Sequence, residues 1–229
     1  MTTIHSHVDT LDLRDPNSAA PPLGRGWAHC GTSAGVLGLV IFGLTGALNV
    51  DESAMADNAE IAALLTDKAP FVWAYQVLGV ATALLLVIFA TGLYRRLAQQ
   101  SPAQSLAPML SVGGLWLTAA MSLVGSGICT EMFYGLLQDT EDLDPDTLAA
   151  QLAIFNTMGW VWVGAVLATG AVAVVGLKHG AVTRRLAIGS VVATALAGLT
   201  NIAPLQYMAM PIIALWLIGA GISFARAER

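Results

Sequence analysis

Apolar residues fill six long windows along the chain, and charge, Pro or Asn separates each window from the next. A helix rises about 1.5 Å per residue, so roughly 17 to 25 apolar residues cross the ~30 Å hydrocarbon core of a bilayer. The predicted spans are about 33–50, 71–93, 107–129, 152–177, 186–200 and 207–224, the fifth being the shortest. The pattern therefore predicts an all-α integral membrane bundle of six transmembrane helices, which we expect to occupy residues 29–226.

Composition agrees with this class of protein. Of the 229 residues, 56% are apolar and only 11% are charged, whereas soluble domains carry about 25% charged residues. Lipid is therefore the expected surrounding of most of the chain. We expect the lipid bilayer as its main partner, and no nucleic acid.

Residues 1–28 differ from the rest. The first 26 residues are polar, contain three prolines and lack the apolar core of a cleavable signal peptide. We expect them to form a disordered cytoplasmic tail.

The basic residues indicate the orientation of the bundle. If the amino terminus is cytoplasmic, nine of the ten basic residues fall in inner segments, and only Lys68 lies outside. Anionic lipid and the membrane potential hold Lys and Arg on the cytoplasmic side, so their number in short loops sets topology. We therefore expect both termini to lie in the cytoplasm. The inner bases are Arg14, Arg25, Arg95, Arg96, Lys178, Arg184, Arg185, Arg226 and Arg229.

Both long outer segments contain signals for helices. Residues 57–70, "DNAEIAALLTDKAP", place Ile61, Leu64 and Leu65 three and four positions apart, which predicts a short helix on the outer surface. In the second outer segment Asp144 precedes Pro145, a pattern typical of a helix N-cap. The fourth helix is therefore expected to begin near Asp144.

Six carboxylates lie between residues 131 and 146, without a basic residue among them. A solvated loop and a helix cap explain five of these acids. The alternative, a divalent cation site, lacks the ligand spacing and the turn glycine of an EF-hand loop. The five acids are Asp139, Glu141, Asp142, Asp144 and Asp146.

Glu131 is the sixth acid, and the apolar residues 132–137 that follow it keep it near the outer hydrocarbon boundary. An acid at that depth is costly and usually has a partner or a role. One interpretation is a carboxylate that reaches the headgroup water, and the other is a functional site. Further polar side chains cluster toward the outer ends of the spans, where they would line a cavity open to the outside. The predicted ligand-binding residues are Glu131, Asn156, Asn201, Gln76, Trp160 and Tyr207.

Four aromatic residues, Trp73, Tyr75, Trp160 and Trp162, lie at the same depth in the second and fourth spans. For at least two of them we expect a place in the aromatic belt at the membrane interface. The wall of a pocket is the alternative.

No metal or cofactor is predicted. The four histidines lie outside the spans, so the intramembrane pairs that hold a b-type haem are missing. The sequence also has no P-loop, HExxH or CxxC motif. Cys30 and Cys129 fall at opposite ends of their helices, about 30 Å apart, so we expect two free thiols. An intermolecular bridge through Cys129 is the alternative.

Glycines recur at the small-residue spacings of helices that pack closely in lipid. Examples are Gly31, Gly35, Gly38 with Gly43, and Gly164 with Ala168. A faint internal repeat also aligns residues 62–87 with 149–174, an offset of 87. A true repeat would make the first two spans and the next two parallel copies of one hairpin, as in some transporter folds. Chance matching of apolar residues is the alternative.

The closing residues 203–224, "APLQYMAMPIIALWLIGAGISF", carry most of a family resemblance. With six helices, long outer loops after the first and third spans and an inner arginine pair after the second, the chain resembles small bacterial membrane proteins of a domain-of-unknown-function family. Its Gly-, Ala- and Thr-rich composition is similar to that of actinobacterial members. The resemblance implies a location in the bacterial plasma (inner) membrane, but it implies no reaction, ligand or catalytic residue.

Three classes of function remain. We favour a non-enzymatic binder of a lipid or apolar small molecule, or an accessory subunit that packs against another membrane protein or a second copy. A small transporter is the alternative, although only Pro204 and Pro211 could break a helix as transporter sites require. The second alternative is an intramembrane isomerase or cyclase with Glu131 as acid. A second ionisable group at membrane depth is lacking, so we do not favour an enzyme.

Overall fold

The computed structural model describes residues 24–50, 56–137 and 144–227, and every regular element in these ranges is a helix. Six segments are long and apolar enough to cross a membrane, which confirms the predicted fold class and number of spans. They are α1 (Gly26–Ala47), α3 (Ala69–Gln100), α4 (Ala107–Leu136), the run of α5 (Pro145–Asn156), η2 (Thr157–Trp162) and α6 (Val163–His179), α7 (Arg184–Ile202), and η3 (Gln206–Met208) with α8 (Ala209–Ala227). Their length and composition are those of a multi-pass membrane protein.

Most helices extend beyond the predicted windows. The 32 residues of α3 and the 30 of α4 correspond to about 48 and 45 Å, more than the ~30 Å hydrocarbon core. Polar residues end an apolar window, but they do not end a helix, because the backbone hydrogen bonds continue through them. One consequence is that Glu131, expected just beyond the third span, lies inside α4.

Local signals set where several helices begin. Asp144 caps α5, accepting a hydrogen bond from the Asp146 N–H at 3.3 Å, and Asp57 caps α2 (Asn58–Thr66) by accepting from the Ala59 N–H at 2.9 Å. Each carboxylate satisfies an N–H that the first helical turn leaves without a partner. A proline lies in the first turn of α3, α4 and α5, where its missing N–H is tolerated. The predicted start of the fourth span at Asp144 is confirmed.

Helix α2 lies within the segment predicted to form a short helix. Its Ile61 and Leu65 are buried, whereas Leu64, predicted on the same face, is exposed. The helix packs against α5, and the Asn58 Nδ2 donates a hydrogen bond to Asp146 Oδ1 at 2.8 Å. The apolar face of α2 is therefore covered at least partly by protein. Its position on a membrane surface stays a prediction.

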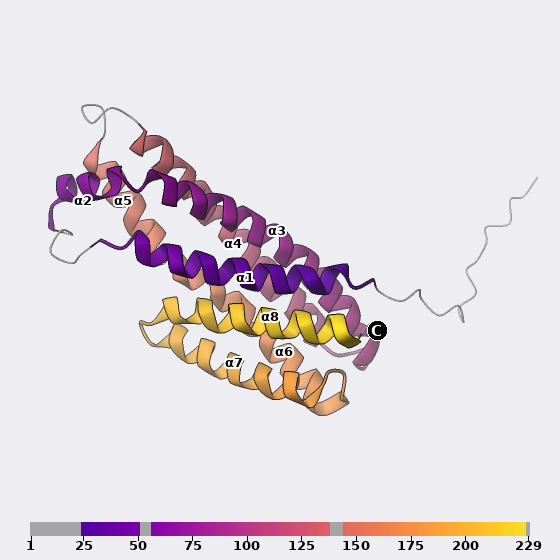
Figure 1. Cartoon of the computed structure of the whole chain (residues 1–229). Helices are drawn as coiled ribbons and strands as arrows, with labels where there is room; N and C mark the ends of the chain where they lie inside the picture. The colour runs from indigo at the N-terminus through magenta and orange to yellow at the C-terminus, as the bar shows by residue number, and fades with distance from the viewer. Residues whose placement is uncertain (1–23, 51–55, 138–143, 228–229) are drawn as a thin grey trace, which may run out of the picture.

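Contacts between neighbouring spans close a ring in the order α1, α3, α4, α6, α7 and α8. Figure 1 shows α8 between α1 and α7. Glycines permit the closest approaches: a Cβ atom on Gly164 of α6 would lie 2.5 Å from the Gly114 carbonyl oxygen of α4. A Cβ atom on Gly35 of α1 would lie equally close to the Ala214 carbonyl oxygen of α8. Such contacts stabilise helix pairs in lipid, where van der Waals packing replaces the hydrophobic effect. The predicted packing role does not extend to Gly43, which has no neighbour within 4 Å.

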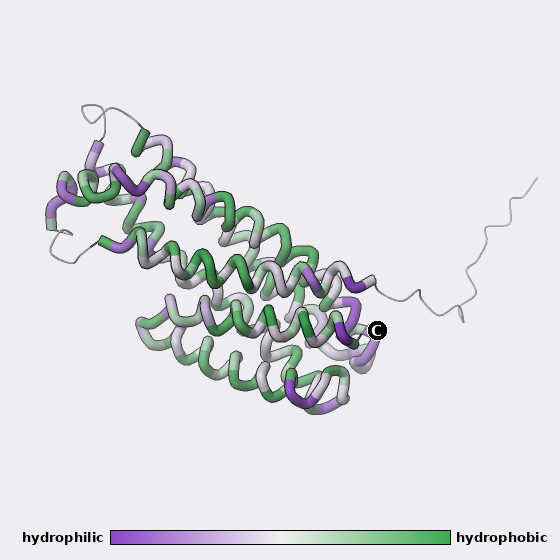
Figure 2. The backbone as a smooth tube through the Cα atoms, viewed as in Figure 1, coloured by the Kyte–Doolittle hydropathy of each residue, from purple (hydrophilic) through white to green (hydrophobic). Residues whose placement is uncertain are grey.

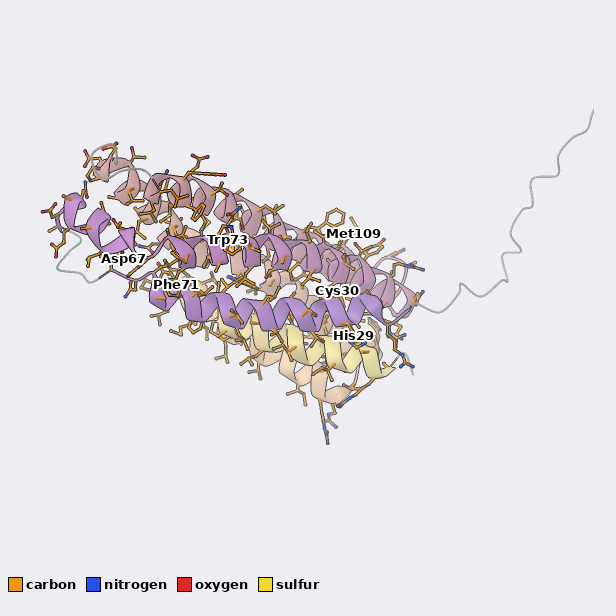
Figure 3. All side chains as sticks on the ribbon, turned by 45° about the horizontal axis from the view of Figure 1, so that its top comes forward. His29, Cys30, Asp67, Phe71, Trp73 and Met109 are labelled. Atoms are coloured by element: carbon orange, nitrogen blue, oxygen red, sulfur yellow. The ribbon has the colours of Figure 1, made fainter. Side chains whose placement is uncertain are left out.

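Charged residues separate to the two ends of the ring, and apolar positions dominate between them (Figure 2). We call the end that carries α2 and the start of α5 the acidic end, and the opposite end the basic end. Figure 3 places Asp67 and Phe71 toward the acidic end and His29 and Cys30 toward the basic end. Both cysteines are free, as predicted. The described bases at the basic end are Arg25, Arg95, Arg96, Lys178, Arg184, Arg185 and Arg226.

Helix boundaries agree with the internal repeat. The caps Asp57 and Asp144 lie 87 residues apart, as do the first residues of α2 and α5. In the first copy α2 and α3 are separate helices, whereas in the second copy α5 continues into α6 through the six-residue 3-10 stretch η2. The fourth span is therefore interrupted close to the position where the first copy has a complete break.

Candidate functional site: a cavity beside the interrupted fourth span

A small cavity lies inside the ring next to η2. Its volume is about 20 Å³, which is room for about one water molecule. A second pocket of about 10 Å³ shares Tyr75, Met158 and Met210 with it, and we call the two together the central cavity. Helices α1, α3, α4, α5, η2, η3 and α8 all contribute side chains to its walls.

Two residues of the cavity wall contain a buried polar atom without a partner. These are the hydroxyl oxygen of Thr82 and the indole nitrogen of Trp162, in side chains that are only 1% and 2% exposed. An unsatisfied buried polar group costs about 1–3 kcal/mol, so each such group calls for an explanation. Both residues line the cavity, although neither polar atom is itself accessible in this conformation.

Other hydroxyl groups in the bundle form a local hydrogen bond that Thr82 does not form. Thr118, Ser122, Ser126 and Thr130 form a line along α4, and each donates to the carbonyl four residues before it, at 2.8–3.1 Å. This local bond is the usual way for Ser and Thr to be satisfied within a helix. Thr82 leaves it unmade, although its backbone is equally helical.

Polar side chains gather around Tyr75 on the acidic-end side of the cavity. Thr45, the Cys129 thiol and Tyr207 lie near its hydroxyl. Thr45 Oγ1 itself donates to the Ile41 carbonyl at 3.0 Å. The Tyr75 ring also packs edge-on against Phe155 of α5, with 4.8 Å between ring centroids. These contacts fix one wall of the cavity.

The 3-10 stretch η2 is held by contacts with η3. The Tyr207 hydroxyl donates to the backbone carbonyl of Asn156, the residue just before η2. A Cβ atom on Gly159 would lie 3.0 Å from Gln206 Cγ, so a larger residue there would have to displace the side chains of η3. The expectation that only Pro204 and Pro211 could break a helix was wrong, because η2 contains no proline. A 3-10 stretch inside a helix often marks a hinge or local strain.

Of the six predicted ligand-binding residues, Tyr207 alone lines the central cavity. Asn156 contributes its backbone carbonyl rather than its side chain. Asn201 is 4% exposed; its Nδ2 donates to the Ala197 carbonyl at 2.7 Å, and its Oδ1 is buried without a partner. The structure therefore brings Tyr207 and Asn156 together and leaves Asn201 outside the cavity wall.

The other three predicted residues lie away from the cavity wall. Glu131 is exposed on α4, and within the described part of the chain no hydrogen bond or ion pair holds its carboxylate. Gln76 is half-buried and does not line either pocket, and Trp160 is 48% exposed. The apolar residues after Glu131 predicted its position along the span, but they could not show which side of the helix the carboxylate occupies.

The aromatic residues divide into two pairs. Trp73 and Trp160 are 53% and 48% exposed, as expected for an interfacial belt, whereas Tyr75 and Trp162 are 8% and 2% exposed and line the cavity. Both pairs are related by the 87-residue offset. The repeat therefore carried a signal for the buried pair, which the predicted site did not include.

No group of three or more His, Cys, Asp or Glu side chains that could hold a metal ion occurs among the described residues. The acids 139, 141 and 142 lie outside those residues, so the alternative of a cation site there stays untested. Residues 31–35, "GTSAG", match the G-x-S-x-G pattern of hydrolases, which requires a sharp strand-to-helix turn. Here they lie within the continuous helix α1 with Ser33 exposed, so they form no nucleophile elbow.

The site thus consists of a water-sized cavity, two unpartnered polar groups in its wall and an interrupted helix beside it. Its walls carry hydroxyl, indole and thioether groups, without a carboxylate or an imidazole. No family model matches the chain, and neither a curated protein nor a solved structure matches it.

Proposed function

We propose that this is a bacterial plasma-membrane protein that binds a small molecule in the central cavity, from its outer side, without catalysing a reaction. The orientation is supported by the bases, since the described part of the chain has seven at one end and only Lys68 at the other. If the basic end lies in the cytoplasm, η2 lies on the outer side of the cavity. A movement of η2 would then open the cavity toward the outside.

The observation that carries this proposal is the pair of unpartnered groups at Thr82 and Trp162. They fit a ligand that offers one hydrogen-bond acceptor and an otherwise apolar surface, because Met121, Met158 and Met210 form much of the remaining wall. In the present conformation the cavity admits only a water-sized guest. Methionine side chains adapt readily to a new shape, so a shift of the 3-10 stretch would enlarge the site.

A transporter is the second candidate, and the interrupted fourth span favours it. Discontinuous helices form the substrate sites of many secondary transporters. Binding alone requires access from one side, whereas transport requires access from both. An enzyme with Glu131 as acid has less support, because this carboxylate does not line the cavity. The resemblance to small six-helix membrane proteins of unknown function fits either candidate, and so does an accessory role beside another membrane protein or a second copy.

Co-purification tests the proposal. The protein is purified in mild detergent, denatured, and the released small molecules are identified by mass spectrometry. We expect a compound in the wild type that is strongly reduced in the double variant Thr82→Val with Trp162→Phe, which removes both polar groups and keeps a β-branched and an aromatic side chain at these positions. The matched control is Trp27→Phe, because Trp27 also has a buried, unpartnered indole nitrogen but lies outside the cavity wall. Equal amounts of every compound in all three proteins would refute the proposal.

A further inference from the structure

A broad groove lies at the basic end, where the start of α7 meets the end of α8. Its volume is about 610 Å³, and Arg184, Arg185 and Arg226 line it together with the hydroxyl residues Thr183 and Ser223. All three arginines are exposed, and no carboxylate of a described residue lines the groove or pairs with them. Within the described ranges these three guanidinium groups have no counter-charge, which favours an anion.

The hydroxyl groups add hydrogen-bond donors between the arginines. Thr183 Oγ1 and Ser223 Oγ lie 3.5 Å apart across the two helices, and Thr183 also accepts from the Leu186 N–H at 3.4 Å. Thr183 caps α7, so the positive end of the helix dipole points into the same groove. Donors and positive charge therefore converge on one place, which suits the oxygens of a phosphate group.

An apolar groove continues from this basic one along α7 and α8. It has a volume of about 470 Å³, and it shares Arg185 and Gly219 with the basic groove. Its walls are mainly aliphatic, and Leu186, Val192 and Leu196 lie along the α7 side. Cβ atoms on Gly189 and Gly219 would meet nothing within 4 Å. The missing side chains thus leave room for a guest between the helices.

The length of the apolar groove matches one leaflet of a bilayer. From Arg185 to Leu196 the helix rises about 16 Å, roughly half of the ~30 Å hydrocarbon core. An acyl chain that begins beside the arginines would therefore end near the bilayer centre. This arrangement of anion site and apolar groove corresponds to the two chemical parts of a phospholipid.

We propose that the groove between α7 and α8 binds one anionic phospholipid from the leaflet at the basic end. Arg184, Arg185 and Arg226 hold its phosphate, and one acyl chain lies along the apolar groove. The charge of the groove matches the anionic lipids of a cytoplasmic leaflet. The site is separate from the central cavity, so its test is independent of the function proposed above.

The test compares lipids on the purified full-length protein in neutral detergent. Native mass spectrometry and thermal unfolding are recorded with phosphatidylglycerol, with phosphatidylcholine of the same chains, and with inorganic phosphate. We expect one bound phosphatidylglycerol and a raised midpoint of unfolding, with much weaker effects of the other two. A basic residue near the surface of an anionic membrane contributes about fivefold in affinity, so Arg184→Gln with Arg226→Gln should weaken binding by roughly 25-fold.

Matched variants separate this site from a general effect of charge. Arg95→Gln with Lys178→Gln removes the same charge at the same end, from residues that do not line the groove, and should leave the affinity within about twofold. Gly189→Leu should fill the apolar groove and weaken phosphatidylglycerol at least tenfold. Its control is Gly113→Leu, another helical position with no atom within 4 Å of an added Cβ.

Three results would overturn the proposal. One is an equal loss of phosphatidylglycerol affinity in both charge-removal variants, which would indicate diffuse attraction. Another is stabilisation by inorganic phosphate that equals that by the lipid and survives Gly189→Leu, which would indicate a phosphate site. The third is a dimer in the native spectrum that Gly189→Leu dissociates, which would make a second copy the occupant of the groove.

Discussion

The contact between Gly114 of α4 and Gly164 of α6 gives the sharpest test of the packing in this bundle. A methyl group added at Gly164 would lie 2.5 Å from the Gly114 carbonyl oxygen and 2.8 Å from Thr118 Oγ1. The Gly114 carbonyl belongs to the backbone and cannot move away as a side-chain end could. Helices α4 and α6 must therefore separate to admit the added Cβ atom. Because α6 continues directly from η2, a displaced α6 would also disturb the cavity wall.

The expected cost of Gly164→Ala follows from overpacking. Extra methyl groups in a closely packed interior cost about 1–3 kcal/mol, and for a chain of this size each kcal/mol lowers the unfolding midpoint by about 2–4 °C. We therefore expect Gly164→Ala to lower the midpoint by roughly 2–12 °C in mild detergent. Gly114→Ala should act similarly, and the double variant should cost less than the sum, because one separation of the helices relieves both clashes.

Gly113→Ala is the matched control. Gly113 precedes Gly114 in the same helix, but a Cβ atom there would meet nothing within 4 Å. Alanine has the higher helix propensity, by about 1 kcal/mol in water, so this control should be neutral or stabilising. The assay is thermal unfolding followed by circular dichroism or by exposure of buried thiols. A midpoint for Gly164→Ala equal to that of Gly113→Ala would refute the close α4–α6 contact.

Three further predictions concern topology, an interhelical bond and a helix cap. In a cysteine-free background, a membrane-impermeant maleimide added to intact cells should label Glu60→Cys and not Lys178→Cys; the reverse pattern would contradict the proposed orientation. The Trp216 indole N–H donates a hydrogen bond to Ser190 Oγ of α7 at 2.9 Å. Such bonds contribute roughly 0.6 kcal/mol in membrane bundles, so Trp216→Phe should lower the unfolding midpoint by about 1–3 °C. The hydrogen bond from Thr147 holds the pKa of Asp144 below its usual value of 3.8, so the carboxylate stabilises the start of α5 fully above that value and loses this effect as the pH falls through the lowered folded-state pKa. The protection of amide protons in the first turn of α5, relative to their intrinsic exchange rates at each pH, should therefore fall in acid, and Asp144→Ala should remove this loss of protection.

The candidate site shows where sequence reasoning reached its limit. The position of a residue along its span could be predicted by counting apolar residues, and Tyr207, which was included on that basis, lies in the cavity wall. The direction of each side chain around its helix was not predictable, and for this reason Glu131 and Trp160 were included and Tyr75 and Trp162 were not. Lipid and the protein interior are both apolar, so hydropathy does not distinguish the side of a helix that faces lipid from the side that faces protein.

The sequence by itself determined the six spans, the all-α class, the cap at Asp144 and the separation of charge between the acidic end and the basic end. These features depend on neighbours along the chain: a run of apolar residues, a carboxylate before a helix, or a base in a short loop. Only the tertiary structure decided the order of helices in the ring, the interruption at η2, and the presence of both Thr82 and Trp162 in one cavity wall. Those features depend on complementary shapes of segments far apart in sequence, and in lipid the decisive contacts are made by small residues such as Gly114 and Gly164, whose partners hydropathy does not specify.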